Sequence, residues 1–212
     1  MASSQLAAGE LAAIKVHGTT REAFLLRSTL AAGAAYGALS ATPYITRALA
    51  KSAVSDVDIV NFALTLEYLE ATFYTTGVKQ VSGLSADDKK LAKEIRDDED
   101  AHVDALIATV KKLGGTPAAK PTFDFGGAFA SSAAFLKTAN VLEDTGVSAY
   151  NGAATSIKSV DVLAAAGSIV QIEARHAALI RLTRGKSPAP LAFDKASQMS
   201  TVLKAVTPFI KA

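Results

Sequence analysis

The sequence predicts an all-α protein in which four helices form a bundle, with one long crossover between the second and the third helix. Apolar residues recur at helical spacing in four long segments, which are rich in Ala and poor in Gly and Pro. The stretch 114–130 lacks a helical pattern and contains Gly, Pro and three Phe residues. Its length suits a connection along the outside of a bundle rather than a tight turn.

This pattern divides the chain into three parts. We expect the bundle over residues 55–186, an N-terminal segment over 1–54 and a C-terminal helical extension over 187–212. With 212 residues, of which 50% are hydrophobic, the chain is long enough for one substantial core. Cysteine is absent, which excludes disulfides and thiolate metal ligands. The 22 basic and 20 acidic side chains nearly cancel without a long basic run, so we expect no nucleic-acid partner.

Capping residues and helix breakers give approximate bounds for five helices. Serine or aspartate stands at the expected starts, as helix N-termini favour. Glycine follows several of the expected ends. The expected helices run over 56–76, ended by Gly77; over 85–112, ended by Gly114; from Ser131 or Ser132 through Tyr150; from Ser159 to Gly185; and over 194–210.

The N-terminal segment resembles an export signal. Basic residues precede a short apolar run over 28–41, and Ala48-Leu49-Ala50 would suit a cleavage site. The segment is similar to a twin-arginine signal, although Glu22 stands where the second arginine belongs. We therefore expect an exported or cell-envelope protein, with membrane association through the apolar run. The alternative is a cytoplasmic protein in which this run packs on the bundle or between subunits, and we expect a homo-oligomer.

The candidate functional residues come from a Glu-x-x-His arrangement that occurs twice, in the second and the fourth expected helix. Residues three apart project from the same side of a helix. Each of the other two helices carries a glutamate on an otherwise apolar face. The six candidate metal ligands are Glu67, Glu99, His102, Glu143, Glu173 and His176.

Four carboxylates and two imidazoles from four helices are the ligand set of a dinuclear carboxylate site in a bundle. Carboxylate oxygens suit iron and manganese ions, and imidazole adds a nitrogen ligand. We therefore expect two Fe or Mn ions, bridged by the glutamates of the two Glu-x-x-His helices. The single glutamates and the histidines would complete the coordination of each ion.

The two halves of the expected bundle also repeat a tyrosine. Tyr74 follows Glu67 by seven residues, and Tyr150 follows Glu143 by the same interval. From the single glutamate to the glutamate of the Glu-x-x-His pair there are 32 residues in the first half (67 to 99) and 30 in the second (143 to 173). The repeat makes both tyrosines candidate catalytic residues, and the alternative is that they are core residues.

Other charged residues near these motifs have two interpretations. Glu70 lies one turn from Glu67 and would be either a group that supports the ligands or a surface residue. Three further charged side chains could orient the ligands but fit exposed helix positions better: Asp98, Asp144 and Arg175. The third histidine, His17, has no partner at a ligand spacing and is expected to be exposed.

Four segments resemble the ferritin-like superfamily: 59–74, 96–102, 142–154 and 169–180. The run Asn61–Glu70, together with Pro188-Ala189-Pro190 and Phe193-Asp194, is similar to ferritin-like-domain proteins described as desiccation- or stress-related. The resemblance implies a dinuclear metal site made by the six candidate ligands. It leaves the reaction open, because members of the superfamily oxidise ferrous iron, remove peroxide or activate oxygen.

Two functional hypotheses follow. In the first, the protein is a dinuclear iron or manganese enzyme whose substrate is small, namely oxygen, peroxide or ferrous iron. In the second, it is a structural or protective protein that acts by self-association, and its metal site is only structural or vestigial.

Overall fold

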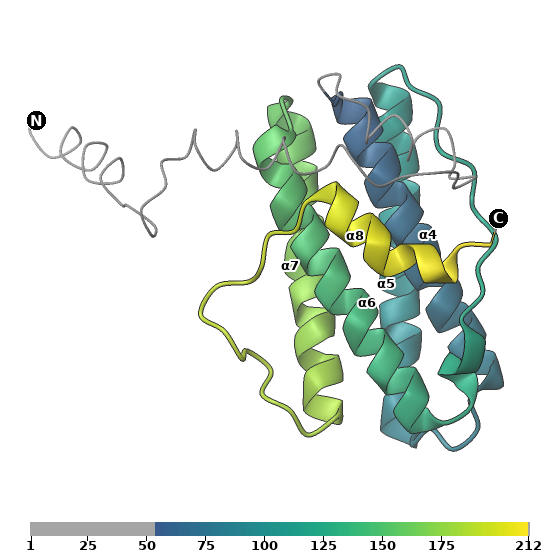
Figure 1. The fold of residues 1–212 in the computed structure, drawn as a ribbon. Coiled ribbons are helices and arrows are strands. Elements are labelled where there is room, and N and C mark those ends of the chain that lie inside the picture. Colours follow the sequence, from purple (N-terminus) through teal and green to yellow (C-terminus); the bar gives the residue numbers. More distant parts are fainter. Residues whose placement is uncertain (1–53, 212) are drawn as a thin grey trace, which may run out of the picture. The chain divides into compact units, whose positions relative to one another are not determined.

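The computed structural model describes residues 54–211 (Figure 1). Four long helices form the bundle: α4 (Asp56–Gln80), α5 (Ala86–Lys112), α6 (Ser132–Ala153) and α7 (Val160–Thr183). Each begins after a serine whose side chain accepts a hydrogen bond from a backbone N–H three residues later. Over the described residues the fold is all-α, as predicted. The predicted export signal and His17 lie outside the described residues.

The connections fix the direction of the helices. Short turns join α4 to α5 and α6 to α7, so each of these pairs is antiparallel. The Asp56 carboxylate accepts hydrogen bonds of 2.9 and 2.7 Å from the backbone N–H groups of Lys158 and Ser159. The starts of α4 and α7 therefore lie at the same end of the bundle.

The predicted crossover is present between α5 and α6 and includes a short 3-10 helix, η1 (Gly126–Phe129). The fully buried Asn61 holds its beginning, because its amide donates to the carbonyl of Thr116 at 3.2 Å and accepts from the N–H of Ala118 at 2.7 Å. Further along, the rings of Phe125 and Phe129 lie 5.3 and 5.4 Å from that of Phe73. Phe125 and Phe129 thus anchor the crossover against the core.

The predicted end of the first helix at Gly77 is wrong, since α4 continues to Gln80. A Cβ added at Gly77 would lie 2.2 Å from Cε2 of Phe135, whose ring is fully buried and stacks on Phe73 with the centroids 4.9 Å apart. This glycine allows α6 to pack closely against α4, and it does not terminate the helix.

The last helix is shorter than predicted. It is α8 (Met199–Val206), followed by the 3-10 helix η3 (Thr207–Phe209), instead of a helix over 194–210. The Ser197 N–H donates to the carbonyl of Ser148 at 2.8 Å, and a Cβ at Gly152 would lie 1.8 Å from the carbonyl oxygen of Ser197. The backbone before α8 is therefore held against α6, where it cannot close helical hydrogen bonds. No helix in the described part of the chain is long and apolar enough to cross a membrane.

The core consists of two apolar clusters, which meet near the start of α4, where Phe62 of one lies between Val60 and Leu64 of the other. One is centred on Phe73, Tyr74 and Phe135, and the other includes Leu64, Leu106, Tyr150 and Val162. On each of the four helices, the candidate metal ligands lie between a residue of one cluster and a residue of the other. The interior of the bundle is thus apolar, polar and apolar in succession.

Candidate metal centre

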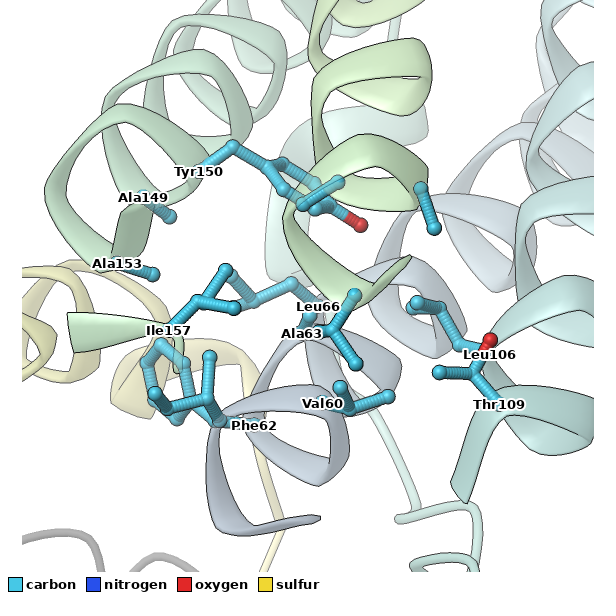
Figure 2. A pocket seen from close by; sticks show the side chains of 14 residues that line it. Val60, Phe62, Ala63, Leu66, Leu106, Thr109, Ala149, Tyr150, Ala153 and Ile157 are labelled. Atoms are coloured by element: carbon cyan, nitrogen blue, oxygen red, sulfur yellow. The ribbon is translucent and has the colours of Figure 1, made fainter. Parts of the chain in front are cut away.

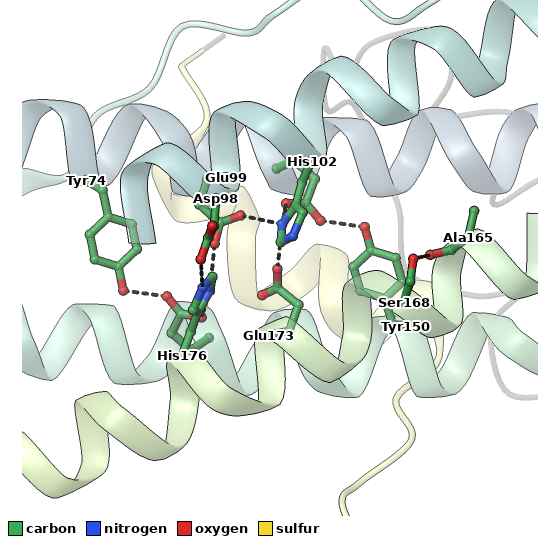
Figure 3. Close-up of polar contacts among 11 residues, drawn as sticks. Tyr74, Asp98, Glu99, His102, Tyr150, Ala165, Ser168, Glu173 and His176 are labelled. Atoms are coloured by element: carbon green, nitrogen blue, oxygen red, sulfur yellow. Dashed lines mark hydrogen bonds and ion pairs between the residues drawn. The ribbon is translucent and has the colours of Figure 1, made fainter. Parts of the chain in front are cut away.

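The six candidate ligands come from four helices and converge inside the bundle. Figure 3 shows four of them close together: Glu99, His102, Glu173 and His176. The four glutamates are each 0% exposed, and His102 and His176 are 8% and 3% exposed. Burying ionisable groups this completely is costly unless a partner compensates their charge. The site therefore calls for positive charge at its centre.

His102 lies close to three carboxylates at once. Its Nδ1 atom is 3.1 Å from Oε1 of Glu173, 3.2 Å from Oε2 of Glu99 and 3.3 Å from Oε2 of Glu67. The Nδ1 atom of His176 is 3.0 Å from Oε1 of Glu99 and 3.5 Å from Oε2 of Glu143. A single ring N–H can be directed at only one of these oxygens, whereas a cation attracts all of them.

The ligand atoms form two groups, within each of which they lie no more than 4.8 Å apart. One group contains Glu67, Glu99, His102 and Glu173, and the other contains Glu99, Glu143, Glu173 and His176. Glu99 and Glu173 belong to both groups. Two adjacent ions could thus share these carboxylates, as the sequence predicts for bridging glutamates.

Unsatisfied polar atoms also indicate a cation. Each of the four glutamates has at least one buried oxygen without a hydrogen bond, and both oxygens of Glu173 and the Nδ1 atom of His176 lack one. Buried polar groups in native proteins normally have partners, so unpaired ones need an explanation. Oxygen and nitrogen atoms in this arrangement fit iron or manganese ions.

Without metal, protons must neutralise the cluster. Burial raises the pKa of Glu99 to about 8, and burial followed by repulsion from Glu99 and Glu67 raises that of Glu173 well above its ordinary value. Burial alone would lower the pKa of each histidine, but the adjacent carboxylates raise it to about 12 for His102 and about 11 for His176. Metal ions would replace these protons.

The two tyrosines contact the cluster reciprocally. The Tyr74 hydroxyl, from α4, donates to Oε1 of Glu143 on α6, and the Tyr150 hydroxyl, from α6, donates to Oε1 of Glu67 on α4. Burial, followed by the charge of the bonded glutamate, raises the pKa of each phenol. Each tyrosine is therefore protonated, and its hydroxyl points at the lone glutamate of the other half, which is the one outside the Glu-x-x-His pair. The sequence repeat predicts that both tyrosines lie near the site. Only the folded structure shows that each tyrosine bonds to the glutamate of the other half.

Glu70 is a buried group beside the cluster, so its interpretation as a surface residue is wrong. It is 2% exposed, and neither carboxyl oxygen has a hydrogen bond. Its counterpart in the second half, three residues after the single glutamate, is Gly146. A Cβ there would lie 3.3 Å from Oε1 of Glu70 and 3.0 Å from Oε2 of Glu173. Glycine thus leaves the space that the Glu70 carboxyl group fills.

One of the three further charged residues contacts a candidate ligand. Asp98 has a side chain 57% exposed, as expected, yet its Oδ2 lies 3.0 Å from Nε2 of His176. Such a carboxylate fixes the orientation of a metal-binding imidazole. Asp144 instead pairs with Arg181, and Arg175 is exposed. Nothing in the local sequence distinguishes Asp98 from its acidic neighbours, because the contact depends on how α5 packs beside α7.

A bundle of four helices that encloses four carboxylates and two imidazoles defines a ferritin-like protein. In agreement, the family model for the ferritin-like domain matches residues 55–186. The chain therefore belongs to the ferritin-like domain family, as the sequence resemblance implied. A search among curated proteins finds no significant match. Membership of the desiccation- or stress-related group stays a prediction.

Proposed function

We propose that this protein is a dinuclear iron or manganese carboxylate enzyme that reduces oxygen or peroxide and so contributes to protection against oxidative stress. The observation that carries the proposal is the pair of buried four-residue groups that share Glu99 and Glu173. Two ions held there would supply one electron each, which is the requirement for a two-electron reduction of either oxidant.

The side chains of the bundle have distinct roles in this proposal. Glu99 and Glu173 would hold both ions, while Glu67 with His102 and Glu143 with His176 would each complete the ligand set of one ion. Asp98 orients the His176 ring. The apolar clusters on both sides exclude water, which strengthens the electrostatic interactions within the site.

The reaction also needs protons. Oxygen takes up two electrons and two protons to become hydrogen peroxide. Hydrogen peroxide takes up two electrons and two protons, its O–O bond breaks, and two waters form. Tyr74 and Tyr150 each hold a phenolic proton at the edge of the cluster, against Glu143 and Glu67. We assign them to the positioning of protons on this basis.

Anaerobic loading tests the proposal. The purified protein is loaded with ferrous or manganous ions, freed of excess metal, and mixed with oxygen or with hydrogen peroxide. We expect two ions per chain and consumption of at least one oxidant, both lost in Glu173→Gln. Two tightly bound ions without turnover of either oxidant would contradict the proposed activity.

The exposed apolar residues favour the second hypothesis, in which the protein acts by self-association. Val160 is 79% exposed and Phe193 is 88% exposed, and Leu182 and Leu191 are more than half exposed. Leu191 and Phe193 are two residues apart in the chain, and exposed apolar side chains close to one another are typical of interaction surfaces. A variant with both Glu173→Ala and His176→Ala separates the hypotheses: stress protection and assembly that survive it would favour association over catalysis.

A further inference from the structure

A small apolar pocket adjoins the metal centre at the end of the bundle where α4 and α7 begin (Figure 2). Its volume is about 30 Å³. Of the 14 residues that line it, only Thr109 and Tyr150 have a polar atom in the side chain. Apolar cavities of this kind stay dry and take up small apolar molecules, because water loses hydrogen bonds on entering them.

Tyr150 belongs to both the pocket and the metal centre. Its ring lines the pocket, and its hydroxyl donates to Glu67. Two other lining residues are also next to candidate ligands, since Leu66 precedes Glu67 and Leu106 lies one helical turn after His102. The pocket is therefore separated from the cluster by a single layer of side chains. Thr109 and Ala165, which also line it, are partly exposed, so the pocket extends toward the surface.

The opposite end of the bundle shows that the pocket is not a necessary result of the fold. Six residues after its single glutamate, the first half has Phe73, and this ring packs against Tyr74 and Phe135 at 5.3 and 4.9 Å. The same position in the second half is Ala149, which lines the pocket beside Tyr150. An aromatic ring fills the space at one tyrosine, and alanine leaves it open at the other.

We propose that this pocket binds dioxygen and supplies it to the metal centre past Tyr150. The proposal rests on the proposed function and narrows its substrate to dioxygen. Dioxygen is small and apolar, so it can enter a dry pocket of this volume. Hydrogen peroxide donates and accepts hydrogen bonds that this lining does not satisfy, so it is excluded from the same route.

Xenon binding tests whether the pocket takes up a small apolar molecule, independently of any catalytic activity. Crystals of the metal-free protein are pressurised with xenon, whose anomalous signal reports occupancy. We expect a xenon peak among Leu66, Leu106 and Tyr150 in the native protein and in Ala164→Leu. Ala164 is an exposed residue of α7 that does not line the pocket, so this variant controls for the change to leucine. Ala166→Leu, which fills the pocket from the same helix, should lack the peak. A native pocket without xenon would overturn the proposal.

Reaction rates test whether the pocket supplies dioxygen to the metal centre. With protein loaded with ferrous ions, Ala166→Leu should slow the reaction with dioxygen by roughly tenfold or more, since a few added carbons in a small pocket exclude a ligand this strongly. The reaction with hydrogen peroxide and the rates of Ala164→Leu should stay near native values. Ala166→Val gives a smaller filling if the leucine variant folds poorly, and its effect should be intermediate. Equal slowing of the reactions with both oxidants, or no slowing of either reaction, would overturn the proposal even if xenon binds. Loaded native protein that reduces neither oxidant would instead contradict the proposed function itself.

Discussion

The two halves of the bundle, α4 with α5 and α6 with α7, each supply the same pattern of three candidate ligands but differ in what surrounds it. The first half adds two carboxylates, Glu70 and Asp98, whose counterparts in the second half are Gly146 and Ile172. Asp98 bonds to His176 of the other half, and no described residue makes the equivalent bond to His102. The repeat thus provides the ligands of a shared site. The positions at which the two halves differ make the surroundings of the two ion positions unequal.

The halves also differ in packing. Near Tyr74 the space is filled by the rings of Phe73 and Phe135, and near Tyr150 a pocket remains that is lined mainly by alanine and larger aliphatic side chains. A symmetric pair of tyrosines therefore lies in two different surroundings. The following variants test which features belong to the shared site and which to one half.

Loss of a shared glutamate should have the largest effect. Because Glu99 and Glu173 belong to both ligand groups, Glu99→Gln and Glu173→Gln should each weaken binding of both ions by at least about 100-fold. Calorimetric titration with manganous ions measures the affinities and the number of sites. Glu94→Gln, at an exposed position of α5, is the matched control and should bind normally. If Glu99→Gln lost only one ion, the shared role would be wrong.

The pH dependence of the metal-free protein should reveal the buried charges of both halves. Glu99 keeps its proton up to a pKa of about 8 in the folded protein but loses it near 4.5 when unfolded. Unfolding therefore releases protons in this range, and stability should fall by a few kcal/mol as the pH rises through it. His102 and His176 add to the fall above 6.5, because their pKa values are also raised on folding.

Urea unfolding at several pH values measures this trend. The metal-loaded protein should not show the same fall, because metal binding requires deprotonated ligands and strengthens as the pH rises. Stability of the metal-free protein that rises between about pH 5 and about pH 8 would contradict the predicted charge balance at Glu99.

The packing difference between the halves predicts unequal costs for enlarging a small side chain at equivalent positions. Gly77→Ala should destabilise the metal-free protein by about 2 kcal/mol, because the new Cβ collides with the buried ring of Phe135, which is stacked on Phe73. The equivalent position of the second half, ten residues after the single glutamate, is Ala153, which lines the pocket. Ala153→Val should cost less than about 1 kcal/mol in the same unfolding measurement. Equal costs would remove the distinction between the two ends.

Asp98→Asn should have the smallest of these effects and should act on one ion only. Asparagine should orient the His176 ring less strongly than aspartate does. The affinity for the ion at Glu143 and His176 should therefore fall by roughly tenfold, and the affinity for the other ion should stay unchanged. Calorimetric titration with manganous ions, fitted with a separate dissociation constant for each site, checks this. Asp100→Asn, two residues away and exposed, is the control. Equal weakening of both sites would mean that Asp98 acts through the fold as a whole.

The contrast also shows which features the sequence could predict. The Glu-x-x-His pairs, the lone glutamates on apolar faces and the serine caps are local patterns, so the candidate ligands and most helix bounds could be predicted from the sequence. The role of Gly77 depends on Phe135, and the contact of Asp98 depends on His176, which lies in another helix of the bundle. Glu70 could not be placed either, because its space exists only where α6 presents Gly146. Each of these features requires the packing of one half against the other.

In the proposed metal centre, side chains from both halves hold two metal ions between them. Anomalous difference maps at the iron and manganese absorption edges, from crystals of metal-loaded protein, test it most directly. We predict two peaks inside the bundle, one bounded by Glu67 and His102 and the other by Glu143 and His176, with Glu99 and Glu173 in contact with both. Metal peaks at the protein surface, with none among these six side chains, would contradict it.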